Sequence, residues 1–306
     1  MPGVRLLLIV NARAGTVTPR KVRFIERALG EEAKVERVDT EQPGHAATLA
    51  RGAAEGTHEA VAVVGGDGTI NEAANGLAGS AVGLGIIPGG GTNVLARSLG
   101  IPPDPIRAAG HLLARLEAPA RRIPLGRAGD RYFTFACGMG LDGEIVRQVE
   151  RRQALKKAAG HGFFLWTALR VGLIDYDLRT PRIEMRWGDD LEHEARGLVF
   201  AISQNLDPFT YLTRFPLHIC PRAGLDLGLD CLGARPLSRF RTVRWAMKTL
   251  GSARHIRDRR AVYVHDQRRI DLRADRPLPV QMDGEFVGES RHLALESVPA
   301  ALGIYA

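Results

Sequence analysis

Cysteine is scarce in this chain, with three residues among 306. Cys137, Cys220 and Cys231 contain no CxxC pair, and each stands in apolar sequence. The nine histidines form no HxxxH pair and no cluster with cysteine, so the sequence gives a zinc site no support. We therefore expect three reduced, buried thiols in a cytoplasmic protein rather than a disulfide framework.

Long hydrophobic runs are also missing. No stretch approaches the roughly 20 apolar residues that a membrane-spanning helix needs. The apolar run at residues 4–10 is short, lacks a small-residue cleavage site and ends in a turn signal at residues 11–15. We expect the first buried strand there, and we expect any membrane contact of this cytoplasmic protein to be peripheral.

Aromatic residues make up only 6% of the chain, whereas the net charge is +8. A basic surface attracts nucleic acids or anionic lipids, but the interleaved aromatic residues of a single-strand binder are absent. Basic clusters at residues 147–157 and 254–260 are either solvated faces or contacts with an anionic membrane. We expect no nucleic acid partner, and salt-sensitive duplex binding remains an alternative supported by charge alone.

The most informative segment is a glycine turn between an apolar strand and a polar helix start. Residues 60–64 have the composition of a buried strand, and apolar residues recur at helical spacing over 70–77. The glycines within 65–68 leave backbone N–H groups open to an anion, and the helix dipole adds to the attraction. Asp67 is placed where a carboxylate could hold magnesium between phosphates. A tight turn with a solvated Asp is the alternative.

A second unit with the same order of features favours the phosphate site. An apolar strand at residues 83–87 is followed by glycines at 89–91, then Thr92 and Asn93, then a helix start. Ligands of open parallel sheets bind beyond the carboxyl ends of the strands, where both glycine turns would lie. Neither turn matches the GxxxxGK[ST] phosphate loop or the GxGxxG dinucleotide fingerprint.

These motifs resemble those of the soluble diacylglycerol kinase and lipid kinase family, which includes the sphingosine kinases and shares its fold with NAD kinases. The resemblance runs from NARAG at 11–15 through GGDGTINEAANGL at 65–77 and PGGGTNVLARSLGIP at 88–102. It continues in the looser matches FACGMGLD at 135–142 and DGE at 283–285.

The resemblance implies an α/β protein with two domains. Residues 1–122 form a doubly wound domain like that of NAD kinases and phosphofructokinases, and residues from about 298 to 306 return to it. Residues 123–297 form an antiparallel β-sandwich-like domain for the lipid substrate. The sequence pattern agrees, because strands and helices alternate up to about residue 122 and strand signals dominate afterwards.

The resemblance also implies a site for ATP, with Mg²⁺, along the two glycine turns. The residues that we expect to bind the nucleotide are Asn11, Thr40, Gly65, Gly66, Asp67, Gly68, Thr69, Asn71, Glu72, Gly89, Gly91, Thr92 and Asn93. From their chemistry alone, the Thr and Asn residues could instead cap helices. Glu72 could orient the loop or complement a helix dipole.

Phosphoryl transfer needs positioning, charge neutralisation and a base for the acceptor hydroxyl. The resemblance places the base in the DGE motif, so we expect Glu285 as the base, Asp283 in support, and Asp67 acting on the phosphates through magnesium. The residues alone do not rank the two acids and leave open a hairpin with solvated acids. The expected reaction transfers the γ-phosphate of ATP to the hydroxyl of a diacylglycerol-like lipid.

Two positions depart from the family pattern. Val94 stands where many members have Asp in GTxND, and Leu227 stands where the family has the Asp of a structural magnesium site. If that site exists here, we expect Gly224, Asp226 and Leu229 to form it. These departures keep open a nucleotide-binding regulator with little turnover, and the shared GGDGT keeps open a soluble acceptor such as NAD.

The remaining expectations concern partners. The apolar and aromatic segment at residues 156–176 is either core packing or an interfacial helix that begins at Lys156 and Lys157. The expected partner is a lipid substrate at an anionic membrane surface, reached peripherally. A homodimer is compatible with the sequence.

Overall fold

The computed structural model describes residues 3–152, 165–212 and 215–306. The chain divides into two compact units. The first contains Met1–Leu125 and Pro299–Ala306, and the second contains Gly126–Val298. No helix within the described ranges is long and apolar enough to cross a membrane.

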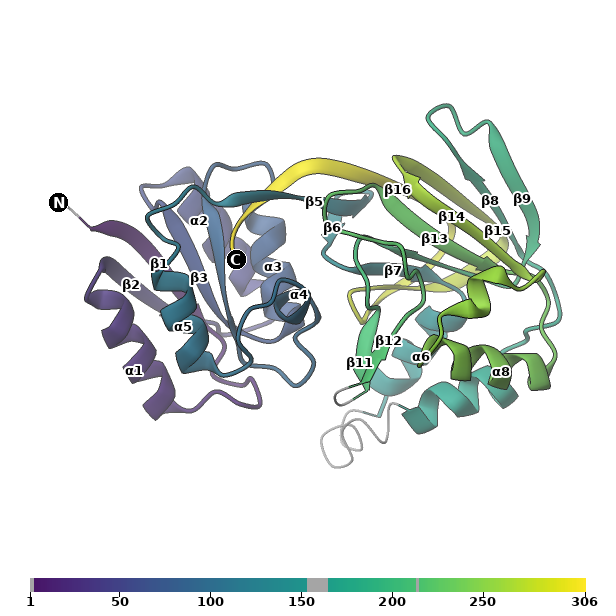
Figure 1. Cartoon of the computed structure of the whole chain (residues 1–306), viewed down its shortest axis with the longest axis horizontal. Coiled ribbons are helices and arrows are strands. Elements are labelled where there is room, and N and C mark those ends of the chain that lie inside the picture. The colour runs from purple at the N-terminus through teal and green to yellow at the C-terminus, as the bar shows by residue number, and fades with distance from the viewer. Residues whose placement is uncertain (1–2, 153–164, 213–214) are drawn as a thin grey trace. The chain divides into compact units, whose positions relative to one another are not determined.

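The first unit is built on a parallel sheet (Figure 1). Its strands are β1 (Val4–Val10), β2 (Ala33–Asp39), β3 (Ala60–Gly65), β4 (Gly83–Pro88) and the end of β16 (Glu285–Tyr305), in the order β16-β4-β3-β1-β2. All neighbours in this order are parallel. Strands β3 and β4 are buried at every position, which explains their unbroken apolar sequence.

Helices in two pairs accompany this sheet. They are α1 (Pro19–Gly30), α2 (His45–Glu55), α3 (Asp67–Leu77), the short α4 (Val94–Ser98) and α5 (Pro105–Leu113). Helix α1 packs against α5, and α2 packs against α3, as expected of a doubly wound fold. Asp104 caps the start of α5, because its carboxylate accepts the N–H groups of Ile106 and Arg107.

The second unit is an antiparallel sheet with helices. The path β14-β13-β10-β7-β15-β16 joins β14 (Ala261–Gln267), β13 (Leu229–Ala234), β10 (Phe200–Gln204), β7 (Ala136–Met139), β15 (Arg269–Met282) and β16. Off this path lie β5 (Arg121–Ala128), β6 (Arg131–Phe133), β8 (Ile183–Trp187) and β9 (His193–Leu198). A separate hairpin pairs β11 (Thr210–Leu212) with β12 (Phe215–Leu217). This architecture confirms the predicted fold class.

The helical elements of the second unit include α6 (Leu141–Glu150), α8 (Arg239–Thr249), the π-helical turn η1 (Val171–Asp175) and the 3-10 turn η2 (Arg254–Arg257), and residues 165–170 are helical as well. Helix α6 packs against β15, and α8 contacts both η1 and η2. In Figure 1, α6 and α8 are both drawn below the strands of the large sheet in this unit. All three cysteines are free and buried in this unit, as expected.

The predicted aromatic segment at residues 156–176 is only partly described. Lys156, Lys157 and the aromatic residues up to 164 lie outside the described ranges. Of the remainder, Val171 and Gly172 are buried, whereas Trp166 and Leu169 are exposed. The described part therefore contains core positions and surface positions.

A glycine sets the close approach of α2 and α3. A Cβ atom added at Gly76 would lie 2.4 Å from the carbonyl oxygen of Ala47 and 2.8 Å from Cβ of Ala50. Gly76→Ala is therefore expected to destabilise the protein by about 1–3 kcal/mol through overpacking. Thermal unfolding followed by circular dichroism measures the change.

The matched control is Gly52→Ala in α2, where an added Cβ meets no described atom within 4 Å. This variant gains helix propensity, so its stability should rise by up to about 1 kcal/mol. Equal melting temperatures for the two variants would contradict the tight approach at Gly76.

Candidate active-site residues

The predicted nucleotide residues gather at the carboxyl edge of the parallel sheet. Asn11 follows β1, Thr40 follows β2, and the two glycine turns follow β3 and β4. Backbone hydrogen bonds knit these ends together, since the Asn11 N–H donates to Val64 (2.9 Å) and the Thr40 N–H donates to Val10 (2.8 Å). The edge thus assembles residues that are far apart in the sequence.

The two glycine turns touch each other directly. The Gly89 N–H donates to the carbonyl oxygen of Gly65 at 2.7 Å. A Cβ atom added at Gly90 would lie 2.8 Å from Cα of Gly66, and one added at Gly89 would lie 3.3 Å from Cα of Gly65. The glycines are therefore required by the packing of loop against loop as well as by any ligand. Gly91 is exposed beyond this contact.

Asp67 ties the two turns together. Its Oδ1 accepts the backbone N–H of Val94 at 2.6 Å, so the first residue of α3 is joined to the first residue of α4. The Val94 side chain is buried. Because the contact uses the backbone of residue 94, the departure from GTxND leaves it intact.

Asn93 closes the second turn. Its backbone is left-handed, with φ of 48°, which Asn tolerates better than most residues. Its Oδ1 accepts the Gly90 N–H (3.0 Å) and its Nδ2 donates to the Gly90 carbonyl (2.8 Å). Asn93 therefore clamps the loop, and no side-chain capping bond from it to α4 is present among the described residues.

The other predicted residues support the same edge. Asn11 Nδ2 donates to Thr69 Oγ1 at 2.9 Å, which links the turn after β1 to α3. Glu72 accepts the N–H of Ala46 at 3.2 Å, in the first turn of α2, so it complements a helix dipole, although that of the neighbouring helix. Asn71 is buried, and its carbonyl accepts Asn75 Nδ2 at 2.9 Å. Gly68 and Thr92 are half-buried.

Asp283 is a buried anchor of the DGE turn in the second unit. Its carboxylate accepts the N–H groups of Thr134 (2.6 Å), Phe135 (2.9 Å) and Ala136 (3.0 Å), and also the Thr134 hydroxyl (2.8 Å). Burial raises the pKa of this carboxyl, and the four hydrogen bonds oppose that rise. The contacts hold a left-handed turn, in which Asp283 has φ of 48° and Gly284 has φ of 79°.

Glu285 has a different environment from Asp283. Its side chain is 43% exposed, and its Oε2 lies 2.5 Å from the guanidinium of Arg131. Of the two acids, Glu285 is the one that solvent and a substrate can reach. The expected order, with Glu285 as the base and Asp283 in support, stays a prediction.

Comparison with known proteins identifies the family. The diacylglycerol kinase catalytic domain matches residues 5–128, and the YegS C-terminal NAD kinase beta sandwich-like domain matches residues 136–306. The second match alone covers more than half of the chain. The chain belongs to the diacylglycerol kinase and YegS-like lipid kinase family. It is therefore a phosphotransferase of the lipid kinase type.

Individual relatives agree with this assignment. A diacylglycerol kinase of Bacillus subtilis (strain 168) is 27% identical over 83% of this chain and 82% of the relative. A probable YegS-like lipid kinase of Pseudomonas putida is 24% identical over 87% of this chain and 83% of the relative. A crystal structure of a diacylglycerol kinase from Bacillus anthracis has a TM-score of 0.78 at 22% identity, covering 98% of this chain and 96% of that one, which shows the shared fold.

Asp142 is a residue of this lipid kinase for which the sequence motifs predict no role. It lies in the first turn of α6 and is buried, which raises the pKa of its carboxyl to about 7, while a hydrogen bond from Gln281 opposes the rise. Gln281 also accepts the Gly284 N–H at 2.8 Å. Gln281 therefore connects Asp142 to the DGE turn. The only signal in the sequence was the position of Asp142 in the FACGMGLD stretch.

An apolar cavity of about 200 Å³ lies in the second unit. Its wall includes Asp142 and Leu141 from α6, Phe200 from β10, and Trp245 from α8. Leu165, Leu169, Val243 and Leu250 line the cavity and are also exposed to solvent, so they mark its mouth. Most of the lining is aliphatic or aromatic, as in sites for apolar ligands.

The residues expected for a structural magnesium site remain a prediction. Gly224 and Asp226 lie in the turn before β13, and Leu229 is its first residue. Asp226 is exposed. The neighbouring Asp230 is buried and already accepts a hydrogen bond from Asp266 N–H (2.9 Å) and one from the Tyr263 hydroxyl.

The two acids of the DGE turn should respond differently to loss of charge. Asp283→Asn places an amide NH₂ against backbone N–H donors, so it should lower the free energy of unfolding by about 3 kcal/mol. Glu285→Gln removes an exposed ion pair and should change it by less than about 1 kcal/mol. Urea unfolding followed by tryptophan fluorescence reports on the second unit, which contains Trp166, Trp187 and Trp245.

Equal stability of the two variants would refute the anchoring role of Asp283. Asn tolerates a left-handed backbone, so a loss in Asp283→Asn reports the hydrogen bonds rather than backbone strain.

Asp142 should make stability depend on pH. The unfolded carboxyl ionises near its ordinary pKa of 3.8, whereas the folded one keeps its proton up to about pH 7. The folded state is therefore penalised progressively between these values, by up to about 4 kcal/mol, and the penalty is constant above pH 7. The Asp142→Asn variant lacks this penalty.

The advantage of Asp142→Asn over the native protein should therefore grow from pH 4 to pH 7 and then level off. Urea unfolding at several pH values measures this difference. Asp130→Asn, at an exposed position, is the control and should show a flat difference. A flat difference for Asp142→Asn as well would mean that Asp142 ionises normally in the folded protein.

Proposed function

We propose that this lipid kinase transfers the γ-phosphate of ATP to the hydroxyl of a diacylglycerol-like lipid. The observation that carries the proposal is the apolar cavity whose wall includes Asp142. Asp142 is joined through Gln281 to the turn that presents Glu285. An acyl chain suits the apolar lining, and the acceptor would then lie in the unit that carries the base.

The nucleotide end of the proposal rests on the carboxyl edge of the parallel sheet. Helix α3 begins at Asp67, and its first N–H groups and dipole favour an anion there. Asn11, Thr40, Thr69 and Thr92 add hydrogen-bonding side chains at or next to this edge. The triphosphate of ATP fits a site of this chemistry better than a neutral ligand does.

The donors present fit a magnesium ion that arrives with ATP. Within residues 3–152, 165–212 and 215–306, no group of three or more His, Cys, Asp or Glu side chains is placed to hold a metal. Mg²⁺ commonly takes one or two carboxylates together with substrate phosphates, and Asp67 is the acid of the glycine turns. The ion would neutralise phosphate charge during transfer.

Glu285 would act as the general base. It accepts the proton of the lipid hydroxyl as that oxygen bonds to the γ-phosphorus, and the bond from this phosphorus to the oxygen of ADP breaks. The ion pair with Arg131 keeps the carboxylate of Glu285 oriented. Asp283 fixes the turn through its four hydrogen bonds.

The alternatives have less support. A soluble acceptor such as NAD does not suit the apolar cavity, because the polar rings and charged phosphates of NAD do not match an apolar lining. A regulator without turnover was suggested by Val94 and Leu227. The contact of residue 94 with Asp67 uses the backbone, so Val94 gives this alternative no support. We therefore place this peripheral enzyme at a membrane surface that supplies its acceptor.

Transfer of labelled phosphate from ATP to a total lipid extract in mixed micelles, with magnesium, tests the proposal. We expect one labelled lipid class, identified by chromatography. Glu285→Gln should lower the rate on the order of a hundredfold or more through loss of the base, and Asp67→Asn should do so through weakened phosphate binding.

Glu289→Gln is the matched control. Glu289 lies in the same strand and pairs with Arg147 at 2.9 Å, so its loss should leave transfer unchanged. ATP binding without any labelled lipid would instead support the regulator or a soluble acceptor.

A further inference from the structure

The net charge of the chain is concentrated in one short segment. Residues 235–260 contain nine Lys and Arg residues and one acid, Asp258, so their net charge is +8. The whole chain also has a net charge of +8. The basic and acidic residues of the other 280 positions therefore cancel, and this segment, which includes α8 and η2, accounts for the entire excess.

Folding gathers these cations around a hollow. Six basic residues line a hollow of about 360 Å³ together with Asp258, namely Arg241, Arg244, Lys248, Arg254, Arg257 and Arg259. Asp258 lies 3.6 Å from Arg244 and 4.0 Å from Arg241, so one carboxylate faces several guanidinium groups. The excess of positive charge makes the hollow a site for anions.

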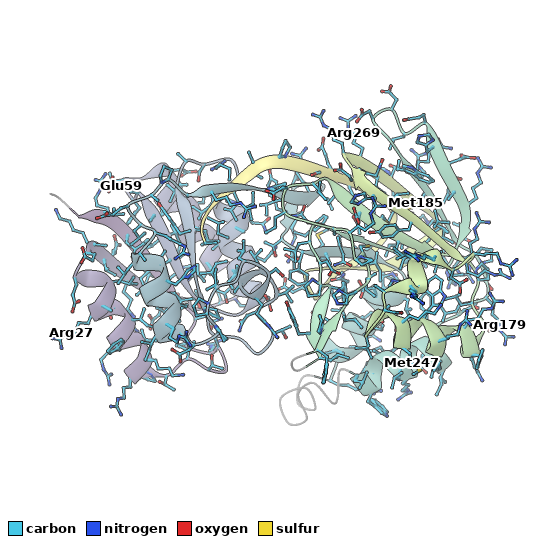
Figure 2. The ribbon with its side chains drawn as sticks, in the orientation of Figure 1. Arg27, Glu59, Arg179, Met185, Met247 and Arg269 are labelled. Atoms are coloured by element: carbon cyan, nitrogen blue, oxygen red, sulfur yellow. The ribbon has the colours of Figure 1, made fainter. Side chains whose placement is uncertain are left out.

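An apolar stripe runs beside the cations on α8. Phe240, Val243, Met247 and the following Leu250 recur at spacings of three and four residues and share one face of the helix. Phe240 is 78% exposed and Met247 is 71% exposed. In Figure 2 the labelled Met247 lies at the lower edge of the second unit, whereas Met185 lies among the strands.

The opposite face of α8 lines the apolar cavity of the second unit. Trp245, Ala246 and Thr249 line that cavity, and Val243 and Leu250 stand at its mouth. Leu165 and Leu169, also at the mouth, extend the exposed apolar surface. The cavity therefore opens onto the same surface that carries the apolar stripe.

We propose that this surface, formed by α8, the hollow around η2 and the mouth of the cavity, is where the protein docks on a bilayer of anionic phospholipids. The hollow binds headgroup phosphates, and the stripe enters the interface between headgroups and acyl chains. A helix with exposed Phe and Met beside Arg and Lys has the composition of an interfacial anchor. This inference deepens the proposed function, because it supplies the entrance through which a lipid acceptor reaches the cavity.

A second copy of the chain is a poorer occupant of the same surface. A two-fold dimer places the same patch of both subunits face to face, which would oppose two segments of charge +8. An anionic bilayer instead neutralises that charge, and each suitably placed Lys or Arg strengthens the attraction.

Co-sedimentation of the purified full chain with vesicles tests the proposal without ATP or turnover. We expect binding to vesicles of phosphatidylcholine mixed with phosphatidylglycerol, and little binding to phosphatidylcholine alone. The charge variant Arg244→Gln/Lys248→Gln/Arg257→Gln should weaken binding on the order of a hundredfold at low salt. The stripe variant Phe240→Ser/Met247→Ser should weaken it by at least tenfold, including at higher salt, where charge is screened.

Helix α1 offers a matched control, since it also exposes a phenylalanine among arginines. The variant Arg20→Gln/Arg23→Gln/Arg27→Gln/Phe24→Ser makes comparable changes at exposed positions and should bind vesicles like the native protein. Far-ultraviolet circular dichroism and thermal unfolding confirm that each variant is folded. Native-like vesicle binding by both the charge variant and the stripe variant overturns the proposal.

Two further outcomes would also overturn it. If sedimentation velocity without lipid shows a dimer of the native protein, and the stripe variant is a monomer, the surface belongs to a contact with a second copy. Binding of duplex DNA in place of vesicles, lost in the charge variant but not in the stripe variant, would assign it to nucleic acid.

Activity in micelles distinguishes failure of the docking proposal from failure of the proposed kinase reaction. In detergent micelles, where docking on a bilayer is not required, both docking variants should phosphorylate a dispersed lipid at the native rate. Transfer in micelles with no vesicle binding would keep the kinase and reject the docking surface. Vesicle binding without phosphate transfer in micelles would keep the docking surface and reject the kinase reaction.

Discussion

The geometry of the DGE turn in the second unit depends on one buried carboxylate. Asp283 gathers three consecutive backbone N–H groups and a hydroxyl around its two oxygens, at the start of β7 and the end of β15. An uncompensated carboxylate in this position would be expensive to bury, and the four donors offset that cost. With the turn fixed, Gly284 adopts its left-handed backbone, Gln281 reaches both Gly284 and Asp142, and Glu285 projects to the exposed side.

The first unit uses the same device at its own turns. The side chains of Asp67 and Asn93 form hydrogen bonds with backbone groups of the two glycine loops. The loops consequently form a rigid edge before any ligand arrives, which lowers the entropic cost of binding. Residues that the motif suggests as ligands are thus partly occupied with building the site.

Local pattern was sufficient for much of this architecture. The alternation of apolar strands and glycine turns predicts the parallel sheet, because each β–turn–α unit is contained in about twenty residues. Local pattern does not predict contacts between residues that are far apart in the sequence. Nothing in the DGE motif indicates that Asp283 would be enclosed by residues 134–136, or that Gln281 would reach Asp142. These pairs are 139 to 149 residues apart and depend on strand register.

The sequence indicates the proposed docking surface only in part, because it marks the basic residues 254–260 but not the apolar stripe. Arginines separate Phe240, Val243 and Met247 in the sequence, and these three residues share a face because a helix begins at Arg239. The basic clusters at 147–157 and 254–260 do not by themselves show that residues 235–260 account for the whole net charge.

The concentration of charge in residues 235–260 also has a kinetic consequence. When the excess charge of a protein lies on one side, the field of an anionic membrane exerts a torque on the protein as well as an attraction. The protein is therefore oriented before it contacts the membrane. Such steering extends only over the Debye length, about 8 Å at physiological ionic strength. The rate of productive landing should therefore carry the salt dependence, while the lifetime of the landed state is set by the apolar stripe. Encounter and residence would then be tuned by separate side chains on the same helix.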